Sequence, residues 1–134
     1  MKIKFLVAEE FRIESKGTQI GIGIYADDVL LSSEQSSENG APVNPLAIEK
    51  LSFLCNIAEM PDDVYNLSGV IFSPSGAQHG ARFELGRVQI TPLKSATVIL
   101  AAHPFTVPEF GEYRFDLSVN EVVTSHAFHI RPGP

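Results

Sequence analysis

Apolar and polar residues alternate over short stretches along the 134-residue chain. These stretches are rich in Val, Ile, Phe and Tyr and are separated by clusters of Gly, Pro, Asn and Ser, a spacing typical of a β-sandwich or β-barrel. The pattern predicts about eight strands, in residues 2–8 with 11–14, 19–25 continuing to 31, 50–58, 66–73, 81–90, 96–102, 112–119 and 122–130.

The clearest element is a hairpin in residues 111–130, whose first half alternates as a strand with one buried face does. A two-residue turn at Asn120 and Glu121 would bring the apolar faces of the two strands into one register. That register places Val119 opposite Val122, Leu117 opposite Thr124, Phe115 opposite His126 and Tyr113 opposite Phe128.

Residues 44–58 allow two interpretations. Asn44 as N-cap and Pro45 at the first position are typical of a helix start. Apolar residues at positions 51, 53, 55 and 57 instead alternate with polar ones at period two. We therefore expect a strand, preceded by at most one helical turn.

Residues 32–45, SSEQSSENGAPVNP, have almost no apolar side chain to bury and many turn formers. Such a composition is typical of a mobile loop. With no repeat or second linker, residues 1–134 form one predicted domain, of a length that can bury a core without disulfides or metals. The predicted fold class is all-β, an antiparallel sandwich of about seven to nine strands.

Composition and charge narrow the function classes. Ten basic and sixteen acidic residues give a net charge of −6, which disfavours nucleic-acid binding. The N-terminal apolar stretch is too short for a secretory signal or a membrane span, so we expect no membrane association and a cytoplasmic location. The single cysteine, Cys55, lies in an apolar run and is interpreted as a buried hydrophobic residue.

The histidines do not form a metal motif. His126 and His129 are three positions apart on a strand and so project to opposite faces. We expect His126 on the core side with a hydrogen-bond partner and His129 facing solvent. His79 and His103 would join a zinc site only by chance convergence in the fold.

Three other motifs have structural interpretations. Residues 21–26, GIGIYA, fit a dinucleotide fingerprint but are followed by strand-like residues, so we expect a strand whose glycines lie under a close neighbour or a bulge. The doublets Asp27-Asp28 and Asp62-Asp63 lack the Asp-x-Asp spacing of a calcium loop. Residues 73–80 lack the lysine and helix of a phosphate-binding loop, and Ser75 has no recognisable base beside it.

Two segments resemble an uncharacterised family of small bacterial proteins with relatives in phage genomes. The matching features are Arg12 with Glu14, the Lys16-Gly17 turn, the strand 22–25, and a closing hairpin with Gly111, Tyr113, Phe115 and Leu117. Asn120-Glu121 stands where Asn-Gly or Asp-Gly is usual in that hairpin. The resemblance implies an immunoglobulin-like sandwich and, because the family has no established activity, no function.

The leading functional hypothesis is a non-enzymatic interaction or assembly module, either a phage-encoded accessory, virion component or inhibitor, or a bacterial adaptor. It would bind a protein partner or form a homo-oligomer through a sheet edge or end loops. The alternatives are a β-sandwich that binds a small ligand or calcium, and an enzyme with an unrecognised site. The sequence assigns no catalytic, cofactor-binding or metal residue. Residues 96–102 carry no charge, which predicts a strand that is either central in its sheet or covered by another chain.

Limited proteolysis of the isolated protein should cut first within residues 32–45, because this polar, turn-rich segment buries little. Mass spectrometry of the first fragments locates the cut. Uniform protection of the segment in the isolated protein would contradict the prediction, whereas protection that appears only with a partner would identify a binding element.

Overall fold

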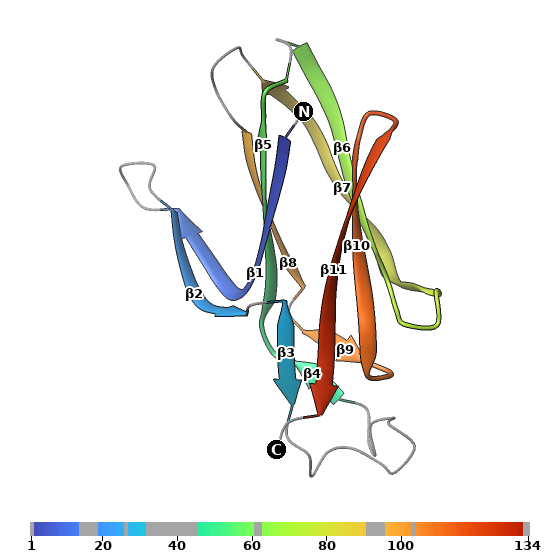
Figure 1. Cartoon of the computed structure of the whole chain (residues 1–134). Coiled ribbons are helices and arrows are strands. Elements are labelled where there is room, and N and C mark those ends of the chain that lie inside the picture. The colour runs from blue at the N-terminus through green and yellow to red at the C-terminus, as the bar shows by residue number, and fades with distance from the viewer. Residues whose placement is uncertain are drawn as a thin grey trace.

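The computed structural model of the chain describes residues 2–13, 19–25, 27–31, 46–60, 63–90, 96–102 and 104–132. The predicted loop at 32–45 and His103 lie outside these residues. Within them the chain forms strands and turns, and no helix long and apolar enough to cross a membrane is found. The structure describes eleven strands (Figure 1): β1 (Lys2–Ile13), β2 (Gln19–Tyr25), β3 (Asp28–Leu31), β4 (Leu46–Ile48), β5 (Leu51–Ala58), β6 (Asp63–Phe72), β7 (Gln78–Ile90), β8 (Ala96–Ala102), β9 (Phe105–Val107), β10 (Gly111–Val119) and β11 (Val122–Pro132).

The strands form two main sheets that face each other. One has four strands in the order β2-β1-β5-β8, and the other has five in the order β3-β11-β10-β6-β7. The strands β4 and β9 form a separate two-stranded sheet at the end where the C-terminus lies (Figure 1). The predicted all-β sandwich is confirmed, and its strands pair antiparallel except for β3, which runs parallel to β11.

The sequence pattern gave too few strands for two reasons. The short strands β3, β4 and β9 have only three or four residues each and show too little alternation to be recognised. The expected continuous strand from 19 to 31 is also wrong, because the chain leaves one sheet and enters the other near Asp27. Asp27 has a left-handed φ of 60°, a conformation that aspartate tolerates better than most residues.

The predicted C-terminal hairpin is confirmed in its full register. Val119 lies opposite Val122, and Phe115 lies opposite His126. Asn120 adopts a φ of 54° in the turn, and its Oδ1 accepts a hydrogen bond from the backbone N–H of Asn66 at 2.9 Å. The turn is thereby attached to β6, the next strand of the sheet.

The core between the sheets is built around aromatic side chains. Phe53 of β5 stacks on Phe115 of β10 with ring centroids 5.0 Å apart, and Phe128 of β11 meets Phe53 edge-on at 5.3 Å. Such ring pairs add about 0.5–1.5 kcal/mol beyond the burial of their area. All three side chains are fully buried, so they join the centres of the two sheets.

The strand interpretation of residues 51–58 is confirmed, and the preceding residues 46–48 form β4 rather than a helical turn. Phe53, Cys55 and Ile57 face the core as the period-two pattern predicts. Leu54 points to the opposite face and is still only 6% exposed, because it packs with Ala8 and Phe11 on the outside of the four-stranded sheet.

Residues 19–25 form β2, as expected for a strand rather than a nucleotide-binding loop. Gly23 has a φ of 63°, and a Cβ there would lie 2.7 Å from the side chain of Glu9 on β1. The glycine is therefore explained by a close neighbour and by a backbone conformation that side chains disfavour.

The uncharged strand β8 lies at the edge of the four-stranded sheet, where it pairs with β5 alone among the described strands. The interpretation as a central strand is therefore wrong for the single chain. Periodicity predicts which side chains are buried but not the order of strands, because a central strand and a covered edge show the same pattern.

Burial raises the pKa of the Cys55 thiol from 9.0 to about 12. The unfolded chain therefore forms the thiolate at a lower pH than the folded chain does. The stability that Cys55 contributes is complete below pH 9 and is lost as the pH rises toward 12.

We predict that the free energy of unfolding of the wild-type protein falls by about 1.4 kcal/mol more than that of Cys55→Ala between pH 8 and pH 10. Urea titrations at each pH measure the free energy of unfolding of both proteins. The cost of truncating the side chain is the same at both pH values, so it cancels when the changes with pH are compared. If the free energy of unfolding changed with pH by the same amount in the two proteins, the predicted thiol ionisation would be contradicted.

Candidate functional site

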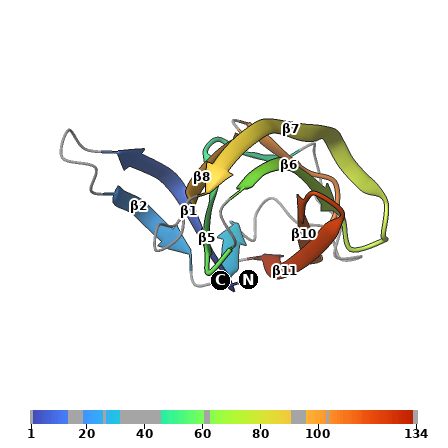
Figure 2. The same cartoon turned by 90° about the horizontal axis from the view of Figure 1, so that it is seen from above.

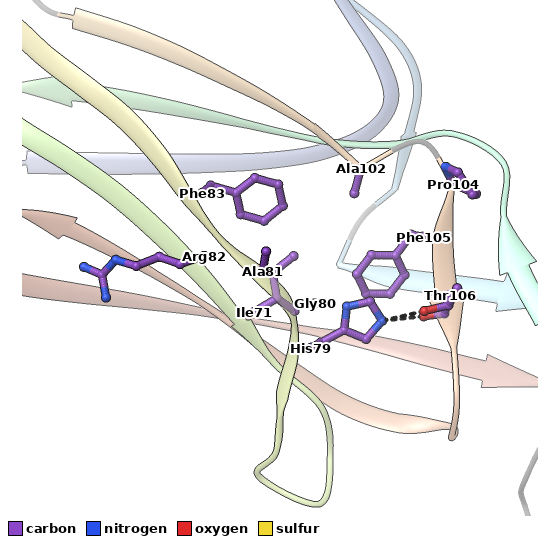
Figure 3. Close-up of a pocket in the computed structure, with 10 residues that line it drawn as sticks. All are labelled: Ile71, His79, Gly80, Ala81, Arg82, Phe83, Ala102, Pro104, Phe105 and Thr106. Carbon is purple, nitrogen blue, oxygen red and sulfur yellow. Dashed lines mark hydrogen bonds between the residues drawn. The ribbon is translucent and has the colours of Figure 1, made fainter.

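A cavity of about 320 Å³ opens on the side of the sandwich where the edges of the two main sheets approach each other. It lies between the first half of β7 on one side and Ala102, Pro104 and β9 on the other (Figure 3). Its lining residues are mainly apolar and come from four strands and the connection between β8 and β9: Ile71, His79, Gly80, Ala81, Arg82, Phe83, Ala102, Pro104, Phe105 and Thr106.

The irregular pairing of β6 with β7 accompanies this opening. The register shifts between Gly69, which lies opposite Phe83 on β7, and Ile71, which lies opposite His79. Gly80 lies between those two β7 residues with a φ of 71°, and a Cβ there would meet no atom within 4 Å. Bulges of this kind bend a strand and increase its twist, and β7 arches over the side of the sandwich toward β8 (Figure 2).

His79 is the main polar group of the cavity. Its ring stacks on Phe105, with centroids 4.2 Å apart. Its Nε2 lies 2.6 Å from the carbonyl oxygen of Thr106 and 3.1 Å from the Thr106 hydroxyl (Figure 3). Because a carbonyl oxygen only accepts, the imidazole Nε2–H is the donor.

The guanidinium of Arg82 takes no part in the cavity. It donates a hydrogen bond to the hydroxyl of Ser68 on the neighbouring strand β6 and lies 3.3 Å from a carboxylate oxygen of Glu84. Figure 3 shows its side chain directed away from the rings of Phe83 and Phe105. Among the described lining residues, the wall is thus mainly apolar and His79 contributes an imidazole.

The expected placement of the C-terminal histidines is confirmed. The Nε2 of His126 lies 2.8 Å from a carboxylate oxygen of Asp27, and its ring stacks on core-side Phe5 at 5.0 Å. His129 is on the opposite face, where its Nε2 lies 3.6 Å from a carboxylate oxygen of Glu112. The two histidines are therefore held by different carboxylates and do not converge.

The Asp27-Asp28 doublet is also divided between two partners. Asp27 faces His126, whereas Asp28 lies 2.7 Å from the Nε of Arg131. Asp62 and the side chain of Asp63 lie outside the described part of the structure. Within that part, no group of three His, Cys, Asp or Glu side chains is arranged to hold a metal ion.

The remaining nucleophile candidates are occupied or buried. In the β6–β7 turn, the Ser75 hydroxyl lies 3.1 Å from that of Ser73, which also donates to the carbonyl of Ala77 at 3.2 Å. Residues 73–77 thus form a hairpin connection, whereas residues 78–80 of the predicted loop belong to β7. Cys55 is fully buried, so its thiol lacks the exposure that reactive cysteines have.

Sequence reasoning considered His79 only as a metal ligand and missed its contact with Thr106. The two residues are 27 positions apart and lie on strands of different sheets. Because a local pattern carries no information about such a pairing, only the three-dimensional structure identifies this cavity.

Comparisons of the chain with protein-family models, with curated proteins and with solved structures find no match. Functional inference therefore depends on the geometry of the molecule itself.

We predict that the purified protein carries no stoichiometric transition metal, because His126 and His129 face opposite ways and His79 is bonded to Thr106. Elemental analysis after purification without chelators measures the metal content per chain. About one equivalent of zinc or iron per chain would contradict the prediction and would direct attention to His103.

Proposed function

We propose that this protein is a non-enzymatic interaction or assembly module that associates through the free edge of β8. The observation that carries the proposal is the position of β8 at the edge of its sheet, combined with the absence of charge from Ala96 to Ala102. An exposed strand edge offers unpaired backbone groups to another strand, and natural proteins normally protect such edges.

The other edges of the two main sheets carry protective features that β8 lacks. The edge strand β7 has charged side chains at Arg82, Glu84 and Arg87 and two shifts of register. The edge strand β2 is interrupted by the left-handed Gly23, and β3 is only four residues long with Asp28 at its start. In contrast, β8 pairs with β5 in an unbroken register along all seven residues.

A second copy of the chain is the simplest partner for this edge. An antiparallel pair of β8 strands related by a two-fold axis at Ile99 would place Val98 opposite Leu100 and Thr97 opposite Ala101. Each contact then occurs twice, as in an isologous interface. No like charges would meet, and two four-stranded sheets would become one continuous sheet.

The outer face of the four-stranded sheet supports the same arrangement. Leu6 of β1, Leu54 of β5 and Ile99 of β8 are opposite one another in register and form an apolar row across these strands. Leu6 is 47% exposed. In the proposed dimer, the rows of the two copies would meet at Ile99 and extend across the shared sheet.

We further propose that the sandwich is of the immunoglobulin type, as the resemblance to the bacterial and phage family implies. Tyr113, near the start of β10, donates from its hydroxyl to the carbonyl of Glu109 at 2.6 Å, which is the geometry of the tyrosine corner in that fold. Two residues later, Phe115 stacks on Phe53 of β5, at the place where many such domains have a disulfide between the sheets. On this proposal the protein acts in the cytoplasm or, if phage-encoded, in the virion.

The register of the proposed dimer can be tested with two matched double variants. Thr97→Lys with Ala101→Lys would place like charges opposite each other twice, whereas Thr97→Lys with Ala101→Glu would place opposite charges there. We predict that the second variant remains a dimer and that the first dissociates, with dimer dissociation constants that differ by about tenfold or more.

Size-exclusion chromatography with light scattering measures the oligomeric state, and circular dichroism verifies that each variant is folded. A wild-type protein that stays monomeric at high concentration would reject self-association. Equal behaviour of the two folded variants would reject this register.

A further inference from the structure

The cavity at the side of the sandwich is separate in its chemistry from the β8 edge, and its interpretation does not rest on the proposed function. Its volume is about 320 Å³. An engineered apolar cavity of about 150 Å³ binds benzene, so this one has room for a group of two fused rings. Its size also lies at the lower end of the range for small-molecule sites, about 300–1,000 Å³.

The walls favour a flat apolar ligand. Phe83 and Phe105 present aromatic rings, and Ile71, Ala81 and Ala102 contribute aliphatic groups. Aromatic rings pack against one another in stacked or edge-to-face arrangements that favour a planar guest. The guanidinium of Arg82 is bonded to Ser68 and is directed away from Phe83 and Phe105 (Figure 3), so among the described lining residues no guanidinium or ammonium group points between these rings to select an anionic ligand.

The imidazole of His79 adds one specific polar requirement. Its Nε2–H is donated to the carbonyl of Thr106, so in the neutral ring the other nitrogen, Nδ1, carries a lone pair and accepts hydrogen bonds. Nδ1 has no hydrogen-bond partner in the described part of the chain, and it lies on the side of the ring turned away from Thr106 (Figure 3). Stacking on Phe105 holds the ring in this orientation.

We propose that this cavity binds a small neutral aromatic molecule that carries one N–H or O–H donor, of the indole or phenol type. The ring system fills the space between β7 and the residues Ala102, Pro104 and Phe105. Its donor meets the lone pair of His79 Nδ1. A site built to accept one hydrogen bond discriminates against a ligand of equal shape without the donor, because Nδ1 then loses its contact with water and gains none.

The test uses indole and benzofuran, which have nearly the same size and differ in the N–H donor. We expect indole to bind the wild-type protein at pH 8 about 3- to 10-fold more tightly than benzofuran. The expected binding also shifts the methyl signals of Ile71 and Ala81 in two-dimensional NMR spectra. In His79→Phe, which keeps a ring against Phe105, the preference for indole should disappear.

Two further variants locate the binding. Ala102→Phe fills the cavity from β8 and should abolish binding of both probes. Ala127→Phe, at an exposed position of β11 that does not line the cavity, should bind both as the wild type does. The proposal is overturned if indole does not bind saturably, if binding survives Ala102→Phe in a folded protein, or if the wild type binds the two probes equally.

Discussion

The stack of Phe53 on Phe115 is the contact on which the rest of the structure depends. These rings come from β5 and β10, which lie inside the two opposing sheets, and their centroids are 5.0 Å apart. Each ring also determines which side chains of its strand face the core. A shift of the strand by one residue in its pairing register would turn every core side chain outward. The central contact joins the middles of the sheets and does not close the side between β7 and β8.

Ion pairs contribute little to the stability of this fold. The ion pairs found in the described residues join side chains that are at least partly exposed, such as Lys2 with Glu59 and Arg131 with Asp28. Pairs of this kind are each worth about 0–1 kcal/mol. The charged residues instead lie on surfaces and edges, and the lack of charge along β8 is the basis of the proposal that this edge is covered by another chain.

The sequence was sufficient to predict elements that depend on neighbouring residues. The register of the C-terminal hairpin follows from one turn and one alternating pattern, and the placement of His126 on the core side follows from the same register. The break at Asp27 and the edge position of β8 could not be predicted in this way. Both depend on which distant strand pairs with which, and periodicity in one strand does not carry that information. For the same reason, the contact between His79 and Thr106 could not be predicted from the sequence.

The central claim is that the free edge of β8 is covered by a second copy of the chain. Amide hydrogen exchange at two protein concentrations tests it most directly, because backbone N–H groups exchange slowly only when they are hydrogen-bonded or excluded from water. The account predicts that amides within Ala96–Ala102 directed away from β5 become protected as the concentration rises, while the amide of the exposed Glu121 in the β10–β11 turn does not change. Rapid exchange of the outward-directed β8 amides at every concentration would contradict it.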